Sequence, residues 1–444
     1  MRPRSKSRPR GLLWSFAYVT LIALPLIVLA SGLVALRGSG WWFDFSMGLG
    51  FGALALMGGQ FLLTARFRRA TAPFGMDVLY VLHRWLAVLA FGLVMAHYLI
   101  LRVRYPATLA PAWPMEAPLS MTAGRAALAL FAVLIVSSLW RKSLRIEYDG
   151  WRIAHAVLAV AGVGLALVHV MGVAYYSGVF WTRSMLELFL GSLVAIVAYV
   201  RIVKPILLTG RPYRVTHVRE ERGRSWSLTL EPEGHRGLRF APGQFAWLSL
   251  GHSPLKAREH PFSFSGSAEG GAALEFTIKE LGDFTDTIGE IEVGTVAYVD
   301  GPHGIFTVDR HPDAPAFLFI AGGVGIAPIV SILRTLADRG DARPMGLVYG
   351  TRSWDATPLR AEVARLSTRL DLEVEHVLEE PHDGWDGAVG WPDPELIGGV
   401  LAKLPEGVQC FMCGPDPLTD MAQDALRERG VPMRHIHLEL FEMA

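Results

Sequence analysis

The chain has 444 residues, 51% of them hydrophobic and 19% charged, which is too apolar for a disordered chain or an ordinary soluble enzyme. Its formal net charge of +1 conceals two unlike halves: up to Lys204 there are 20 basic and 6 acidic residues, and after it 22 and 35. The positive charge lies in the more apolar half, which excludes a uniformly basic nucleic-acid-binding protein, and two cysteines exclude a disulfide scaffold.

Six apolar runs, each long enough to cross about 30 Å of hydrocarbon, predict a six-helix transmembrane bundle. The runs lie at Gly11 to Leu36, Phe45 to Thr64, Val78 to Leu101, Ala123 to Trp140, Ile153 to Ala174 and Met185 to Val203. The first run exceeds the core of about 7–15 residues in a signal peptide, so we expect it to be retained. Basic residues are densest before the first run and after the second and fourth. This pattern predicts a multi-pass protein of a bacterial-type plasma membrane with both termini cytoplasmic.

Four histidines interrupt these runs: His83 and His97 in the third, and His155 and His169 in the fifth. A separation of 14 residues within each pair puts both imidazoles within about 40° of one helix face, about 21 Å apart. The two helices run in the same direction, so His83 is expected to face His155 and His97 to face His169. Layers so far apart cannot share one ion, whereas haem takes two imidazoles from opposite faces. We predict two bis-histidine b-type haem sites; the alternative is that each histidine is a packing residue hydrogen-bonded across the bundle.

Short alternating segments broken by glycine and proline follow Pro205. They lie at Trp226 to Leu230, Phe245 to Leu250, Leu274 to Ile278 and Val296 to Val299. Several such strands at close spacing are typical of an antiparallel β-barrel.

The pattern changes again at an apolar strand, Phe317 to Ala321, which leads into a glycine turn at Gly322 to Pro328 and a helix at Ile329 to Arg339. Glycines in such a turn let a pyrophosphate approach the helix N-terminus, so this order opens a nucleotide-binding α/β unit. A later strand, Val408 to Met412, runs directly into Cys413-Gly414-Pro415. We therefore expect a multi-domain membrane protein with a basic cytoplasmic tail at 1–10, a six-helix haem-binding bundle at 11–204, an antiparallel β-barrel domain at 205–312 and an α/β domain at 313–444.

These motifs resemble known modules. His260-Pro261-Phe262-Ser263, the turn from Gly322 to Pro328, Cys413-Gly414-Pro415 and an aromatic residue near the C-terminus look like the flavin and nicotinamide modules of the ferredoxin-reductase superfamily. Joined to two-haem membrane helices, the whole chain resembles the NADPH oxidase and ferric reductase family in its short prokaryotic form. The resemblance implies a ferric reductase-like transmembrane domain fused to an FAD-binding barrel and an NAD(P)H-binding α/β domain. The implied cofactors are FAD, two b-type haems, and NADPH or NADH.

Carried over residue by residue, the resemblance implies two sets of cofactor contacts. FAD would be bound by His260, Pro261, Phe262, Ser263, Ser265, Lys279, Gly282, Thr285 and Phe441. NAD(P)H would be bound by Gly322, Gly323, Gly325, Pro328, Cys413, Gly414 and Pro415. Phe441 looks like the family's terminal aromatic, which stacks on the flavin until nicotinamide displaces it, although Glu442-Met443-Ala444 follow it here.

Arg352 and the pair Cys410 and Cys413 are further candidates because of their positions. Arg352, just after a predicted strand end, is a candidate to meet a 2′-phosphate and to favour NADPH over NADH. Cys410 and Cys413 form a Cys-x-x-Cys, but there is no second cysteine pair for zinc and Cys410 falls within an apolar strand, so a metal or redox role is not expected.

The family resemblance implies an NAD(P)H oxidase in which electrons pass from cytosolic NAD(P)H to an acceptor beyond the membrane, with O2 giving superoxide. No acid or base is needed, and Phe441 and Cys413 would lie near the hydride transfer. A ferric or cupric reductase has the same architecture, and a membrane module that delivers electrons to a quinone or a partner protein also remains open. A transporter fused to a reductase would need discontinuous helices that the sequence lacks. The lipid bilayer is an implied partner; nothing in the sequence requires a protein partner.

Overall fold

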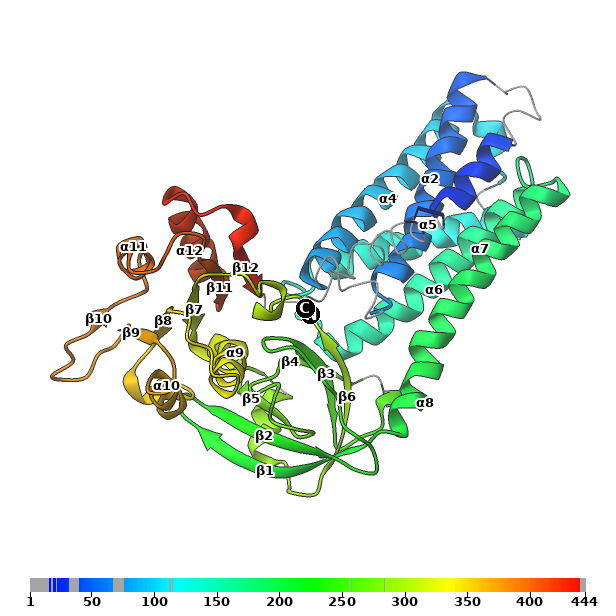
Figure 1. Ribbon diagram of the computed structural model, residues 1–444. Helices are drawn as coiled ribbons and strands as arrows, with labels where there is room; N and C mark the ends of the chain where they lie inside the picture. Colours follow the sequence, from blue (N-terminus) through cyan, green and yellow to red (C-terminus); the bar gives the residue numbers. More distant parts are fainter. Residues whose placement is uncertain are drawn as a thin grey trace. The chain divides into compact units, whose positions relative to one another are not determined.

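The computed structural model contains two compact units, residues 1–204 and 205–443, which are described separately (Figure 1). The described residues are 16, 19–20, 22–31, 40–66, 76–111, 113, 115–256, 258–282 and 284–439. The predicted basic tail, much of the first predicted span and Phe441 lie outside them.

Five helices in the described part of the first unit are long and apolar enough to cross a membrane. They are α2 (Trp41–Leu63), α4 (Met76–Arg104), α5 (Leu119–Leu139), α6 (Tyr148–Val173) and α7 (Phe180–Ala198), which continues through a π-helical turn (Tyr199–Val203) into α8 (Lys204–Thr209). They correspond to the second to sixth predicted runs. A shorter apolar helix, Ile22–Ser31, lies within the first run. The sixth crossing helix therefore stays a prediction.

The membrane helices pack as two pairs, α2 with α4 and α5 with α6 (Figure 1). Lipid tails are as apolar as leucine, so such helices associate through close packing at small residues. Gly58 of α2 shows this: an added Cβ would lie 2.1 Å from the ring of Phe189 on α7. Gly162 of α6 lies in the same way against Phe131 of α5, with an added Cβ at 2.8 Å.

The second unit begins with a six-stranded antiparallel sheet in the order β4-β3-β6-β1-β2-β5. The strands are β1 (Tyr213–Glu221), β2 (Ser225–Pro232), β3 (Phe245–Leu250), β4 (His260–Ser263), β5 (Leu274–Lys279) and β6 (Val296–His303). The two edges approach each other at one isolated bridge, from Phe264 just after β4 to Phe276 of β5. The antiparallel sheet is as predicted; its closure into a barrel stays a prediction.

The unit ends with a six-stranded parallel sheet in the order β10-β9-β8-β7-β11-β12. Its strands are β7 (Phe317–Gly322), β8 (Met345–Thr351), β9 (Leu372–Leu378), β10 (Ala388–Val389), β11 (Gln409–Cys413) and β12 (Ile436–Glu439). Helices α9 (Ile326–Asp338) and α10 (Arg360–Ser367) contribute to the core on one face, and α11 (Pro394–Ala402) and α12 (Asp416–Glu428) to that on the other. Both faces are therefore covered, as parallel sheets require.

The start of α9 differs from the prediction. The helix begins at Ile326, three residues earlier than expected, so Pro328 lies in its first turn instead of in the glycine turn. Proline is tolerated at this position because the first N–H groups of a helix have no partner within the helix.

Candidate functional site

The four membrane histidines lie on α4 and α6, and the structure brings them together in two layers. The ring centroids of His83 and His155 are 6.3 Å apart, a separation that two metal–nitrogen bonds of about 2 Å and two ring radii would fill. His97 lies close enough to His169 for their charges to interact. The pairs are those that the 14-residue spacing predicts.

The neighbouring helices hold three of these imidazoles by their Nδ1 atoms. His97 Nδ1 lies 2.8 Å from the carbonyl oxygen of Ser46 on α2, and His169 Nδ1 lies 2.9 Å from that of Ser120 on α5. His155 Nδ1 lies 3.3 Å from the hydroxyl of Ser138. A carbonyl can only accept a hydrogen bond, so Nδ1 carries the proton in both His97 and His169, and Nε2 keeps a lone pair for iron.

Glycines leave room around the same histidines. An added Cβ on Gly50 would lie 3.4 Å from the His97 ring, and one on Gly124 would lie 2.7 Å from the His169 ring, so each ring packs directly on a helix backbone. Gly92 of α4 and Gly164 of α6 lie between the two histidines of their helices, and an added Cβ there meets no described heavy atom within 4 Å. Helical glycine costs about 1 kcal/mol relative to alanine. These two glycines lie nine residues after His83 and His155, about 180° around each helix, so the open space beside them is on the face opposite the histidines.

The chemistry of this donor set fits two haems. Among the described residues no group of three or more His, Cys, Asp or Glu side chains is placed to hold a bare metal ion, whereas haem iron needs only two protein ligands. The pairs His83–His155 and His97–His169 supply two ligands each.

The predicted flavin residues begin on β4. The ring of His260 stacks on Phe284, with centroids 4.0 Å apart and planes 14° from parallel. Phe262 lies 6.2 Å from Phe284, so three rings form one aromatic wall. Pro261 lies between His260 and Phe262 on β4. Sequence reasoning missed Phe284, although it lies inside the segment from Gly282 to Thr285 that was singled out.

Two predicted flavin contacts are committed to other bonds. Ser265 is fully buried and accepts a hydrogen bond from Thr277 Oγ1 at 2.9 Å, inside the antiparallel sheet. Thr285 accepts a hydrogen bond from the Leu281 N–H at 2.8 Å and donates to the Gly282 carbonyl at 3.0 Å, which closes the turn before a 3-10 helix. Ser263 is also buried, and Lys279 ends β5.

The glycine turn after β7 lies beside Cys413-Gly414-Pro415, because β7 and β11 are parallel neighbours. An added Cβ on Gly322 would lie 2.7 Å from the Pro415 ring, and one on Gly325 would lie 2.1 Å from the Cys413 carbonyl oxygen. Gly323 adopts a positive φ of 54°. Only glycines allow this approach at the carboxyl ends of the strands, where open α/β sheets bind ligands.

Tyr349 of β8 is a further residue that sequence reasoning missed. Its hydroxyl lies 3.1 Å from the carbonyl oxygen of Gly323 and 2.9 Å from that of Pro358. Burial holds the pKa of Tyr349 well above its usual range, so the hydroxyl stays a neutral donor that supports the glycine turn.

Arg352 follows β8 and is exposed, with its guanidinium 2.9 Å from the Glu380 carboxylate. Cys410 and Cys413 pack into the cores on opposite faces of the parallel sheet, so they share neither a metal nor a disulfide. Burial raises the pKa of Cys410 to about 12 and that of Cys413 well above its usual range.

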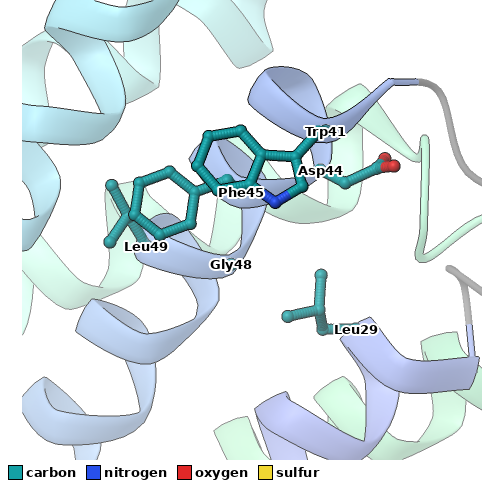
Figure 2. Close-up of a pocket in the computed structure, with 6 residues that line it drawn as sticks. All are labelled: Leu29, Trp41, Asp44, Phe45, Gly48 and Leu49. Carbon is teal, nitrogen blue, oxygen red and sulfur yellow. The ribbon is translucent and has the colours of Figure 1, made fainter.

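A cavity of about 400 Å³ opens on α2 in the membrane unit (Figure 2). It is lined by Leu29, Trp41, Asp44, Phe45, Gly48 and Leu49. Trp41 stacks on Phe45 with ring centroids 5.1 Å apart, and Asp44 accepts a hydrogen bond from Tyr176 at 2.7 Å. The predicted cofactor residues do not line this cavity.

About half of the chain is similar in sequence or structure to the following known proteins. A probable dihydroorotate dehydrogenase B (NAD(+)) electron transfer subunit from Methanopyrus kandleri is 33% identical over 230 residues, which cover 52% of this chain and 78% of that protein. The propane 2-monooxygenase reductase component of Rhodococcus jostii is 30% identical, over 51% of this chain and 62% of that protein, so less than two thirds of its length is spanned. A solved ferredoxin reductase in carbazole 1,9a-dioxygenase is 26% identical, with a TM-score of 0.45, over 52% of this chain and 69% of that one.

Family models match two separate ranges. Residues 49–166 match the ferric reductase like transmembrane component, and residues 319–424 match the oxidoreductase NAD-binding domain. The chain is therefore a fusion of a ferric reductase-like transmembrane domain with an oxidoreductase NAD-binding domain. It is an integral membrane protein, and its second unit is related to electron-transferring oxidoreductases. The ferric reductase-like range contains His83, His97 and His155 and ends three residues before His169. The NAD-binding range contains the glycine turn, Arg352 and Cys413-Gly414-Pro415.

Proposed function

We propose that the chain is a transmembrane NAD(P)H oxidase. Electrons would pass from cytosolic NAD(P)H through FAD and two bis-histidine b-type haems to an acceptor beyond the membrane, with O2 giving superoxide. The observation that carries this proposal is the double layer of imidazoles on α4 and α6, of which the two outer ones have Nδ1 committed to a backbone carbonyl. Histidines that only packed between helices would need neither a second pair at the same spacing nor a fixed tautomer.

The residues of the second unit would bind and orient the nicotinamide and flavin cofactors. Gly322, Gly323 and Gly325 would admit the dinucleotide to the carboxyl ends of the strands, and the buried Tyr349 hydroxyl would keep that turn in place. The aromatic wall of His260, Phe262 and Phe284 would hold FAD, which when bound exchanges the two-electron hydride of nicotinamide for the single electrons that haem accepts.

The orientation follows from charge. By the rule that Lys and Arg stay inside, the basic loops of the first half would lie in the cytoplasm with both of its ends, so the NAD(P)H-binding domain would meet cytosolic NAD(P)H. The layer of His97 and His169 would then be the outer one. If two histidines held each haem, no position would remain for O2 to bind the iron, so the acceptor would be reduced without binding the metal.

Ferric ion is the second candidate acceptor, and the match of residues 49–166 to a ferric reductase like component favours it. Both acceptors would receive electrons from the cofactor held by His97 and His169, so the residue roles proposed here apply to either acceptor.

The decisive experiment is a visible absorption record of the detergent-purified full-length chain with added FAD. We expect a low-spin haem spectrum, haem reduction by NADPH without oxygen, and prompt reoxidation on admitting air, with superoxide detected by cytochrome c reduction that superoxide dismutase abolishes. Haem that stays reduced in air but is reoxidised by ferric citrate would assign the metal as acceptor. A purified chain that binds no haem would refute the proposal.

A single substitution tests whether the electron path passes through the histidine pair His97 and His169. His169→Leu should remove one haem per chain and stop electron delivery to the outside acceptor, while NADPH still reduces the flavin at the wild-type rate. Two haems retained in His169→Leu would refute the ligand assignment.

A further inference from the structure

The pair α2–α4 is repeated as the pair α5–α6. The pattern Ser-Met-x-x-Gly-x-x-Ala-Leu-Ala-Leu occurs at residues 46–56 of α2 and again at 120–130 of α5. The pattern His-x-x-Leu-Ala-Val-x-x-x-Gly-Leu-x-x-x-His occurs at residues 83–97 of α4 and again at 155–169 of α6. Each helix of one pair therefore has a counterpart in the other, residue by residue.

The contacts repeat with the sequence. Ser46 holds His97 through its carbonyl oxygen as Ser120 holds His169, at 2.8 and 2.9 Å. Four residues further along each helix, Gly50 and Gly124 admit the same two rings to the backbone. The two copies therefore support their outer histidines in the same way.

The inner histidines are supported in only one copy. Ser138 lies 18 residues after Ser120 on α5; its hydroxyl donates to the Leu134 carbonyl at 2.6 Å and lies 3.3 Å from His155 Nδ1. His83 is the counterpart of His155, and its Nδ1 is buried with no hydrogen-bond partner in the part of the chain that the structure describes.

The residue 18 positions after Ser46 is Thr64, the C-cap residue that follows α2. Its hydroxyl donates to the Gln60 carbonyl at 3.0 Å, the same bond that Ser138 makes to Leu134. A hydroxyl has one proton and two lone pairs, so Thr64 Oγ1 can still accept a hydrogen bond. It is the polar group at the end of α2 that the repeat aligns with the unpartnered nitrogen of His83.

We propose that Thr64 is a positioning residue for His83: its hydroxyl accepts the Nδ1–H of His83 in the haem-loaded protein, as Ser138 accepts that of His155. The bond fixes the ring and its tautomer, so that Nε2 of His83 is directed at the iron. This inference rests on the proposed function, since it assumes that His83 binds haem.

Gln60 is the competing partner, because its side-chain amide is buried with neither atom hydrogen bonded among the described residues. Its counterpart in the second copy is Leu134, which has no polar side chain. The repeat therefore assigns the bond to Thr64, and Gln60→Leu, which installs the counterpart residue, is the matched control.

The test uses the full-length chain with haem. Thr64→Val keeps the branched shape and removes the hydroxyl, and Thr64→Ser installs the residue found in the other copy. We expect Thr64→Val to weaken haemin binding at the inner site by about 10- to 100-fold and to change the low-spin EPR signal and midpoint potential of that haem alone. Thr64→Ser should restore all three values, and Gln60→Leu should match the wild type. Retention of the outer haem signal in Thr64→Val is the check that the bundle is folded.

Two results would overturn the role of Thr64. One is a Thr64→Val protein whose haemin affinity, EPR signals and potentials match the wild type. The other is an inner haem that changes in the Gln60→Leu protein and stays unchanged in the Thr64→Val protein. That result would assign the hydrogen bond of His83 to Gln60. Failure of the proposed function looks different: the wild-type chain would bind no haem, or His83→Ala would leave both haems in place.

Discussion

The outer histidines are each held from two directions by a neighbouring helix. A serine carbonyl fixes the proton on Nδ1, and a glycine one turn along lets the ring approach the backbone. The two glycines are not equally tight: an added Cβ would lie 3.4 Å from His97 at Gly50, but 2.7 Å from His169 at Gly124.

This difference predicts unequal effects of the same substitution. Gly124→Ala should displace the His169 ring, because real Cβ atoms do not approach within 3.0 Å, whereas Gly50→Ala makes ordinary contact. We expect Gly124→Ala to lower outer haem occupancy by about 10-fold or more, since misplaced ligands weaken metal sites to that degree, and Gly50→Ala to stay near the wild type. Haem content and redox titration of both variants check it; equal occupancy in the two would contradict it.

Phe284 carries a prediction for the flavin. Phe284→Ala removes the ring that stacks on His260 at 4.0 Å, and an aromatic pair contributes about 0.5–1.5 kcal/mol, so the Kd for FAD should rise roughly 2- to 10-fold. Phe284→Tyr keeps the ring and is the control. Titration of the flavin by fluorescence measures both, and an unchanged Kd for Phe284→Ala would remove Phe284 from the flavin wall.

Arg352 carries the prediction on cofactor choice. If its guanidinium exchanges Glu380 for a 2′-phosphate, Arg352→Ala should raise KM for NADPH several-fold and leave KM for NADH unchanged, because NADH has no such phosphate. Steady-state kinetics with both cofactors decide it. An equal rise for the two would mean that Arg352 does not contact the phosphate.

At the scale of elements, the proposed nicotinamide site depends on two turns that lie side by side. The turn after β7 approaches the end of β11 so closely that an added Cβ on Gly325 would lie 2.1 Å from a backbone oxygen, and backbone cannot move aside as a side chain can. Gly325→Ala should therefore abolish NADPH-dependent flavin reduction, with a loss of at least about 100-fold, as expected for misplaced reacting groups. Gly399→Ala in α11, where an added Cβ meets nothing within 4 Å, should retain full activity.

Two half-buried histidines in the parallel sheet predict a pH dependence. Burial lowers the pKa of His376 on β9 and of His437 on β12 to about 4, from about 6.5 in the unfolded chain. Between these values the unfolded state binds more protons, so stability is complete above about pH 6.5 and is lost as the pH falls toward 4. The unfolding temperature of this unit should drop by several degrees from pH 7 to pH 5, and His376→Phe should reduce the drop. A flat profile would contradict it.

The sequence predicts elements and pairings that local geometry determines. The pairing of His83 with His155 follows from helix periodicity alone, and the glycine turn follows from its place between strand and helix. Ser46, Tyr349 and Phe284 could not be found this way, because their roles depend on contacts between segments far apart along the chain. The predicted start of α9 is three residues too late because Pro328 favours a turn by its type, although the first turn of a helix also accepts proline.

At the scale of the whole molecule, the charge distribution predicts topology. The two cysteines of the chain are both buried, so cysteines introduced singly would report accessibility with little background. Met115→Cys lies in the loop between α4 and α5 and should react with a membrane-impermeant maleimide in intact cells. Met433→Cys, in the second unit, should react only after lysis. The opposite pattern would invert the proposed direction of electron flow.

The burial of both thiols also affects how well the protein resists oxidation. Burial keeps both cysteines protonated, and peroxide and related oxidants attack thiolates, so neither sulfur is a ready target. Methionine has no such protection: Met115 is 87% exposed in the loop where superoxide would be released. Oxidation during turnover should therefore appear first as methionine sulfoxide at Met115, in the loop between α4 and α5. The cysteines in the core of the parallel sheet should stay unmodified.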